Sequence, residues 1–223
     1  MVYRSYLDTG LIHPNKHRIH TAPQAVGPHS VVIIGQISDL IVSTLTSMVD
    51  PPTGQGLPLD RVYKNELDTL RKQGRRLMEV GLFADRRRKL ARSAEALLQL
   101  MRFAFYYGLD QRVTDFVIGV HPRHARFYVR SFGFEAFGDP RVYPAVNDRP
   151  VQLLRGDLED RLKRRPLHPA LEYFVSNPVP DGAFTGRYIL KPELMDDSPV
   201  HAFLSDQQLV ASYRSESGLS RAS

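Results

Sequence analysis

Apolar side chains recur at every second position in several short stretches of the chain, a pattern typical of strands. Residues 30–36 and 39–50 form two such stretches on either side of a tight connection, so they predict a hairpin. Further strands are predicted over 75–85, 112–122, 134–138 and 149–158.

A spacing of three to four residues between apolar positions predicts the intervening helices. They are expected over 59–74, 90–108, 123–133 and 158–165, and residues 2–8 fit the end of another helix. Asp60 and Asp85 are the expected caps of two N-terminal ends, and Gly108 is the expected end of the long helix. Strands and helices in this order predict an α/β or α+β domain with a mixed sheet.

The periodic part of the chain ends near residue 165. We therefore expect one domain over residues 1–165 and a C-terminal extension over 166–223. The last residues, "SESGLSRAS", are small and polar, so part of this extension is expected to be disordered.

Composition removes several functional classes. The chain has no cysteine, which excludes disulfides, thiolate metal sites and a catalytic cysteine. The first residues, "MVYRSYLDTG", lack the apolar core of a signal peptide, and no apolar run approaches the roughly 18 residues that a membrane span needs. Neither a dinucleotide-binding nor a P-loop glycine motif is present. A cytoplasmic protein without a membrane span is expected.

The basic charge of the chain is concentrated in one segment. Residues 60–92 contain eleven Lys and Arg against five Asp and Glu, an excess that equals the net charge of +6. Four of these cations, Arg86, Arg87, Arg88 and Lys89, precede the long helix, where the helix dipole disfavours positive charge. Together with Arg92 they predict a surface that receives an anion. The alternative is a solvated basic face.

The third predicted strand carries one acidic side chain, Glu79, on the same face as Gly81 and Phe83. Burial in an apolar strand would raise the pKa of Glu79 towards the range of a general base. The alternative is an ion pair with Arg75 or Arg76, which would lower that pKa. A glycine inside a strand often marks a bulge or the close approach of a ligand, and Gly81 is a candidate for either.

Three segments together carry a resemblance to a known family. "LMEVGLFAD", "VIGVHPRHARFYVRSFGFEAFG" and "RVYPAVNDRPVQLLRGDL" resemble the Gcn5-related N-acetyltransferases, and more closely their branch of N-acyl amino acid synthases and acyl-homoserine-lactone synthases. The resemblance covers roughly residues 30–160. It implies a mixed, mostly antiparallel central sheet flanked by helices, and a fold shortened at its N-terminus.

The resemblance also implies roles for individual residues. Glu79 occupies the position of the family's strand glutamate, and Gly81 and Phe83 lie where a splayed strand holds the thioester of the donor. Tyr128 resembles the tyrosine that protonates the leaving thiolate. Four residues rather than three separate "FY" from "GF" here, so packing in the core is the alternative for Tyr128.

The donor site departs from that of ordinary acetyltransferases. Their glycine-rich turn, which holds the diphosphate of coenzyme A, is replaced by "DRRRKLA". Arg86, Arg87, Arg88, Lys89 and Arg92 would suit a phosphopantetheine arm and an acidic acyl carrier protein better, with acyl-coenzyme A as the other donor. The aromatic residues Phe103, Phe105, Tyr106 and Tyr107 are candidates for core positions, with some lining an acyl tunnel.

We therefore expect an N-acyltransferase that moves a fatty acyl group from acyl carrier protein to an amino acid. No permanently bound cofactor and no metal are expected, because His13, His17 and His20 lack carboxylate or cysteine partners nearby. The alternatives are an acetyl-coenzyme A-dependent N-acetyltransferase, a non-catalytic module that binds nucleic acid, and an inactive acyltransferase fold. Nucleic acid is disfavoured, since residues 60–92 lack interleaved aromatic side chains.

Overall fold

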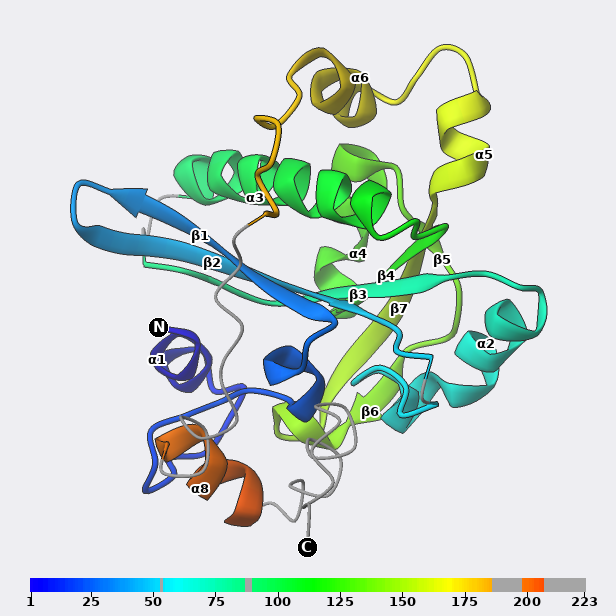
Figure 1. Cartoon of the computed structure of the whole chain (residues 1–223). Helices are drawn as coiled ribbons and strands as arrows, with labels where there is room; N and C mark the ends of the chain where they lie inside the picture. The colour runs from blue at the N-terminus through cyan, green and yellow to red at the C-terminus, as the bar shows by residue number, and fades with distance from the viewer. Residues whose placement is uncertain (53, 87–89, 186–197, 207–223) are drawn as a thin grey trace, which may run out of the picture.

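The computed structural model describes residues 1–52, 54–86, 90–185 and 198–206, without the side chains of 90–93 and 201. A seven-stranded sheet runs through the molecule in the order β1-β2-β3-β4-β7-β5, with β6 paired to β7 (Figure 1). The strands are β1 (Ser30–Ile37), β2 (Leu40–Val49), β3 (Leu77–Asp85), β4 (Asp115–Val120), β5 (Glu135–Ala136), β6 (Arg141–Tyr143) and β7 (Arg149–Asp157). Within the described residues only β3 and β4 pair in parallel, so the predicted mixed, mostly antiparallel sheet is confirmed.

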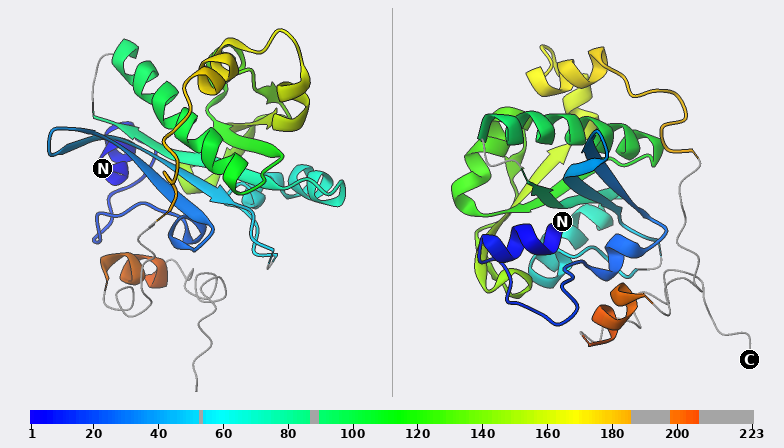
Figure 2. Two further views of the ribbon diagram at one scale, coloured as in Figure 1. Left: turned by 45° about the horizontal axis from the view of Figure 1, so that its top comes forward. Right: turned by 90° about the vertical axis from the view of Figure 1, so that its left-hand side faces the viewer.

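Helices cover both faces of this sheet. In Figure 1, α3 and α6 lie above it, while α1, α2 and α8 lie below it, and the views in Figure 2 agree. The helical segments are α1 (Val2–Asp8), η1 (Pro23–Val26), α2 (Asp60–Lys72), α3 (Leu90–Asp110), α4 (Pro122–Phe132), η2 (Pro144–Val146), α5 (Leu158–Lys163), α6 (Pro169–Ser176) and α8 (Pro199–Asp206). No described helix is both long enough and apolar enough to cross a bilayer.

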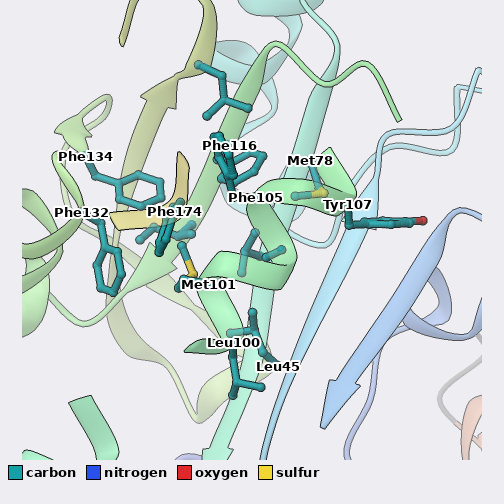
Figure 3. Packing of buried hydrophobic residues seen from close by; sticks show 14 of the residues in the cluster. Leu45, Met78, Leu100, Met101, Phe105, Tyr107, Phe116, Phe132, Phe134 and Phe174 are labelled. Atoms are coloured by element: carbon teal, nitrogen blue, oxygen red, sulfur yellow. The ribbon is translucent and has the colours of Figure 1, made fainter. Parts of the chain in front are cut away.

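Two hydrophobic clusters fill the space between the sheet and the helices on its two faces. The larger one packs α3, α4 and α6 against the sheet and contains Met78, Met101 and Phe116 (Figure 3). The smaller one packs α2 against the other face and contains Leu67 and Leu77. Leu77 and Met78 are neighbours in β3 yet belong to different clusters, because successive side chains of a strand point to opposite faces.

Two expected boundaries are wrong for local reasons. Asp60 is the first residue of α2 rather than its cap, and its carboxylate accepts from the Leu57 N–H. Asp85 is the last residue of β3, paired with Ser43, and its predicted role as the cap of α3 stays a prediction, because residues 87–89 lie outside the described residues. Gly108 lies inside α3, where a Cβ would lie 2.5 Å from the Phe116 ring. Glycine is needed there for close contact between helix and strand, not to end the helix.

Part of the expected extension belongs to the main core. Ala170, Leu171 and Phe174 of α6 lie in the larger cluster, and the Phe174 ring is 5.5 Å from that of Phe105 on α3. The final segment "SESGLSRAS" lies outside the described residues.

Candidate active site

The parallel pair β3–β4 opens at one end. Its pairing runs from Leu77 opposite Asp115 to Glu79 opposite Val117 and goes no further among the described residues. Beyond that point β3 continues along β2 and β4 continues along β7. The two strands diverge, and a cavity of about 410 Å³ occupies the opening between them.

This cavity reaches both faces of the sheet. Leu97 and Met101 of α3 line it on the side of the larger cluster, and Leu59 lines it on the side of the smaller cluster. Side chains from both edges of the opening, among them Val80 and Ile118, complete the wall. Two reactants can therefore approach the same point in the sheet from opposite faces.

A bulge in β3 shapes the edge of the opening. Thr44 pairs with Ala84, while Thr46 pairs with Gly81, so one residue of β2 faces two residues of β3. Leu82, within the bulge, has φ +49°, which is uncommon for a residue with a side chain. The extra residue reverses the alternation of side chains in this strand.

The prediction that Phe83 shares the face of Glu79 is therefore wrong. Leu82 packs against the smaller cluster, while Phe83 packs against the larger one beneath α3. Gly81 does share the face of Glu79, since a Cβ at this position would lie 3.8 Å from Glu79 Oε1. Both Gly81 and Phe83 line the cavity.

Glu79 is the acidic side chain of this cavity, and only 6% of its surface is exposed. Its Oε2 accepts a hydrogen bond from the Leu59 N–H at 2.9 Å, and no described cation forms an ion pair with it. Burial raises the pKa of Glu79 to about 8, although the Leu59 hydrogen bond acts in the opposite direction. A carboxyl with this pKa can take up a proton near neutral pH.

The alternative ion pairs of Glu79 do not form. Arg75 is held by Asp115, Asp157 and Glu159. Arg76 donates from Nε to the Gln111 carbonyl oxygen. Both arginines are fixed beyond the paired end of β3, away from the cavity wall.

Three polar side chains of the cavity were not found from the sequence: Tyr6, His20 and Tyr143. Burial raises the pKa of Tyr6, and neighbouring Tyr128 and Glu79 raise it further. The His20 ring lies 4.8 Å from the Tyr6 ring, and burial lowers the pKa of His20 to about 4, so this histidine is neutral at pH 7. Tyr143 donates to the Pro58 carbonyl at 3.2 Å.

Tyr128 lies in the cavity wall, and its ring also packs against the larger cluster. Burial raises its pKa to about 12, so the hydroxyl keeps its proton at neutral pH. The helix that carries it, α4, begins at Pro122 and is capped by His121, whose Nδ1 accepts from the Arg123 N–H at 3.3 Å.

The apolar wall comes from different residues than expected. Leu45, Met48, Val80, Leu97, Met101 and Ile118 provide it. Phe103, Phe105, Tyr106 and Tyr107 do not line the cavity, because they lie further along α3 among core residues. Tyr106, for example, donates to the Phe174 carbonyl at 3.0 Å.

The basic residues before α3 are only partly described. Arg86 is exposed, and its N–H donates to the Val42 carbonyl at 2.8 Å, but its side chain does not line the cavity. Arg87, Arg88 and Lys89 lie outside the described residues, as does the side chain of Arg92. Their role at the donor site stays a prediction. Three other cations line the cavity: Arg61, Arg123 and Arg149.

Histidines do not gather into a metal site in the described part of the chain, where no three His, Asp or Glu side chains are placed to hold an ion. His17 lies 2.8 Å from Asp206, while His20 faces the cavity.

The splayed β3–β4 pair with a buried glutamate defines an acyltransferase of the Gcn5-related fold. Solved structures of this class match the chain. FeeM, an N-acyl amino acid synthase from uncultured soil microbes, gives a TM-score of 0.60 at 22% identity, over 71% of this chain and 87% of that one. The CoA-dependent acyl-homoserine lactone synthase BjaI, with SAM and isopentyl-CoA, gives 0.52 at 14% identity, over 78% and 77%. TofI, in a ternary complex with an inhibitor and MTA, gives 0.53 at 16%, over 70% and 79%.

The model of the FeeM N-acyl amino acid synthase family matches residues 1–157. The chain belongs to this family and is an N-acyltransferase. A search of curated proteins found no match. The family assignment favours the enzyme interpretation over the nucleic-acid-binding module.

Proposed function

We propose that this N-acyltransferase moves a fatty acyl group from the thioester of an acyl carrier protein to the amino group of an amino acid. The observation that carries the proposal is a buried glutamate to which the described residues offer no cationic partner, placed where a cavity passes through the sheet. The carboxylate of Glu79 takes a proton from the ammonium group of the acceptor. The free amine then attacks the thioester carbonyl.

The remaining steps use the cavity wall. Backbone N–H groups of β3 around Gly81 stabilise the oxyanion of the tetrahedral intermediate, because β4 no longer pairs with this part of the strand. The attacking nitrogen becomes positively charged and loses its extra proton to water, the carbon–sulfur bond breaks, and the leaving thiolate takes the hydroxyl proton of Tyr128. The amide product and the thiol are released, and Glu79 and Tyr128 exchange protons with solvent.

The two faces of the opening suit different reactants. The wall beneath α3 is apolar, through Leu97 and Met101, and receives the acyl chain. The opposite side presents Tyr6, His20 and Tyr143, and receives the polar acceptor. An acetyl donor would leave the apolar wall unused, so a longer acyl group fits better than the acetyl-coenzyme A alternative.

The carrier protein is inferred from the basic segment that precedes α3. An acidic carrier would be oriented by Arg86, Arg87, Arg88, Lys89 and Arg92, with the phosphopantetheine arm reaching the opening. The chain contains no cysteine, which fits a reducing compartment, and we place the reaction in the cytoplasm.

The test compares donors with one acyl chain: acyl carrier protein, acyl-coenzyme A and acyl-pantetheine. Reversing residues 86–89 to glutamate should raise KM for the acyl carrier protein at least tenfold and change acyl-pantetheine turnover less than about threefold, as expected for steering charges. The control reverses Arg130 and Lys163, exposed cations of α4 and α5. Equal losses with all donors would contradict carrier docking, and a wild-type enzyme active only with acetyl-coenzyme A would overturn the fatty acyl proposal.

A further inference from the structure

Two arginines of α2 differ in their partners. Arg71 binds three carboxylates: Asp60 through both guanidinium ends at 2.6 and 2.7 Å, Asp68 at 2.7 Å and Asp50 at 2.5 Å. Arg61, in the first turn of this helix, has no ion pair or side-chain hydrogen bond with any residue that the structure describes, although Asp60 is its neighbour in sequence. Asp50, Asp60 and Asp68 are therefore committed to Arg71, Glu66 pairs with Arg141, and no described carboxylate pairs with the Arg61 guanidinium.

Arg61 lines the same cavity as Glu79. The chain around it is held over the glutamate, because the Leu59 N–H, two residues before Arg61, donates to Glu79 Oε2 at 2.9 Å. Tyr143 lines the same cavity and is close enough to both charged groups to feel their charges. Its hydroxyl donates to Pro58, and its pKa is raised by burial first and then by Glu79, while Arg61 lowers it. Glu79 and Arg61 thus face the same polar end of the cavity.

An amino acid bound there brings a carboxylate close to its amine. When the amine lies against Glu79, the carboxylate must be received by the polar end, and burying it without a cation would be costly. His20 is neutral near pH 7 and cannot supply that charge. Arg123 belongs to the α4 side and donates from Nε to the His124 ring at 3.0 Å. Arg149 lies beside Gly10, at the start of β7.

From this arrangement we infer that Arg61 binds the carboxylate of the acceptor and selects α-amino acids over amines that lack a carboxylate. The inference rests on the proposed acyl transfer to an amino acid and adds the residue that recognises the acceptor. Arg61 is a binding residue in this scheme. The guanidinium offers paired N–H donors to the two carboxylate oxygens, and Glu79 handles the proton of the amine.

The experiment compares each acceptor with its carboxamide. The wild-type enzyme is first offered the twenty amino acids with one long-chain acyl-pantetheine donor, and the best acceptor and its carboxamide are the probes. Arg61→Met should raise KM for the amino acid about 10- to 100-fold, as expected for loss of a hydrogen bond between charged groups. The carboxamide should change less than about twofold. Arg61→Lys should recover part of the loss.

Two further variants test whether the effect is specific to Arg61. Lys64→Met removes an exposed cation of the same helix outside the cavity wall and should leave the preference for the amino acid unchanged. Arg149→Met tests the competing cation. If this variant loses the preference while Arg61→Met keeps it, the assignment to Arg61 is wrong. Melting temperatures show that each variant is folded.

Failure of the inference can be told from failure of the proposed function. Should the wild type acylate none of the twenty amino acids, the function itself would fall. A wild type that uses amino acid and carboxamide equally well would keep acyl transfer and remove carboxylate recognition.

Discussion

Two carboxyl groups are buried in neighbouring strands of the sheet, and their surroundings differ. Asp115 of β4 is fully buried, and its oxygens accept from Arg75 Nε at 2.5 Å and Arg155 Nε at 2.6 Å. Glu79 of β3 is almost as buried, yet its hydrogen-bond partner in the described structure is one backbone N–H. The same chemical group is thus placed once between two cations and once where no described cation pairs with it.

This difference indicates which of the two acids stabilises the fold and which is available for proton transfer. Asp115 stands at the paired end of β3 and β4, where guanidinium groups compensate its charge and the network joins β4, β7 and the start of β3. Glu79 stands where the strands part, with its pKa raised to about 8 because burial disfavours the charge. A buried acid with cations holds strands together, whereas a buried acid without them is available for proton transfer.

The largest expected effect is that of Glu79→Gln. Removing a general base typically costs about 10² to 10⁴ in kcat. The amide oxygen can still accept from the Leu59 N–H, so below about pH 4.5, where the wild-type carboxyl is protonated in both the folded and the unfolded state, the free energy of unfolding should change by less than about 1 kcal/mol. Steady-state turnover and urea unfolding on the same preparation measure both quantities. A fully active variant would remove Glu79 from the mechanism.

Asp115→Ala should show the opposite behaviour. It leaves Arg75 and Arg155 facing each other without the carboxylate, and breaking a buried ion pair from one side costs about 3 kcal/mol or more. The kcat per folded molecule should stay within about twofold, since Asp115 does not line the cavity. Urea unfolding measures the loss. A variant with intact stability and reduced kcat would erase the contrast between the two acids.

The pH dependence follows from the raised pKa of Glu79. Below pH 8 the base is mostly protonated, so kcat/KM should rise about tenfold per pH unit towards pH 8 and then level off. Between pH 6 and pH 8 this amounts to roughly a 50-fold rise for a single titrating group. The control is Glu79→Gln, measured with the same acceptor, which retains only the limb contributed by the acceptor amine. If the pH profiles of the wild type and Glu79→Gln had the same shape, the whole rise in kcat/KM would come from deprotonation of the acceptor amine.

The same shift predicts how stability changes with pH. The pKa of Glu79 is about 8 in the folded protein and near 4.5 when exposed, so the folded state holds this proton over a wider range. Its contribution is fully present below about pH 4.5 and is lost as pH rises through 8. The free energy of unfolding of the wild type should therefore fall relative to Glu79→Gln over that window. A constant difference would contradict the raised pKa.

The sequence predicted the paired part of this site well, because it depends on local periodicity. The alternation of β3 places Glu79 and Gly81 on one face, and the structure confirms it. The alternation fails at Leu82, where a bulge adds one residue and moves Phe83 to the other face. A bulge depends on how β2 pairs with β3, which no spacing within β3 reveals.

The polar end of the site was missed for a different reason. Tyr6 belongs to a short helix, α1, which packs against β3, and His20 belongs to a turn-rich loop and lies beside Tyr6, so both line the cavity that holds Glu79. Nothing in their local sequence marks them, since tyrosine and histidine are common in surface segments. The aromatic run on α3 misled in the opposite way. Its residues are strongly apolar because they pack against α6 and the sheet.

Two glycine substitutions compare the cavity with the packed core between α3 and β4. Gly81→Ala places a methyl group 3.8 Å from Glu79 Oε1 and 3.9 Å from Met48 Cε, which are ordinary contacts, so stability should hold. The methyl group enters the cavity beside the reacting atoms and should lower kcat/KM about tenfold, as small misplacements of substrate do. The control, Gly108→Ala, meets the Phe116 ring at 2.5 Å and should cost about 1–3 kcal/mol of stability without changing kcat.

The smallest expected effect is that of Tyr128→Phe. The hydroxyl keeps its proton at neutral pH, because burial raises its pKa to about 12, and it lines the cavity where the thiolate would leave. A free thiol has a pKa near 8.5, so a thiolate departs readily without an acid at high pH. We expect kcat to fall about threefold at pH 7 and to be unchanged above pH 9, since general acid catalysis matters less as the leaving group becomes stable in its charged form.

Tyr6→Phe provides the matched comparison for this prediction, because Tyr6 lies near both Tyr128 and Glu79 and the pKa of its hydroxyl is also raised by desolvation. If the proton comes from Tyr128, only Tyr128→Phe should show a loss that disappears at high pH. A loss confined to Tyr6→Phe would transfer the proton donor to α1. It would leave Tyr128 as a packing residue of α4, which is the alternative that the altered spacing between "FY" and "GF" had suggested.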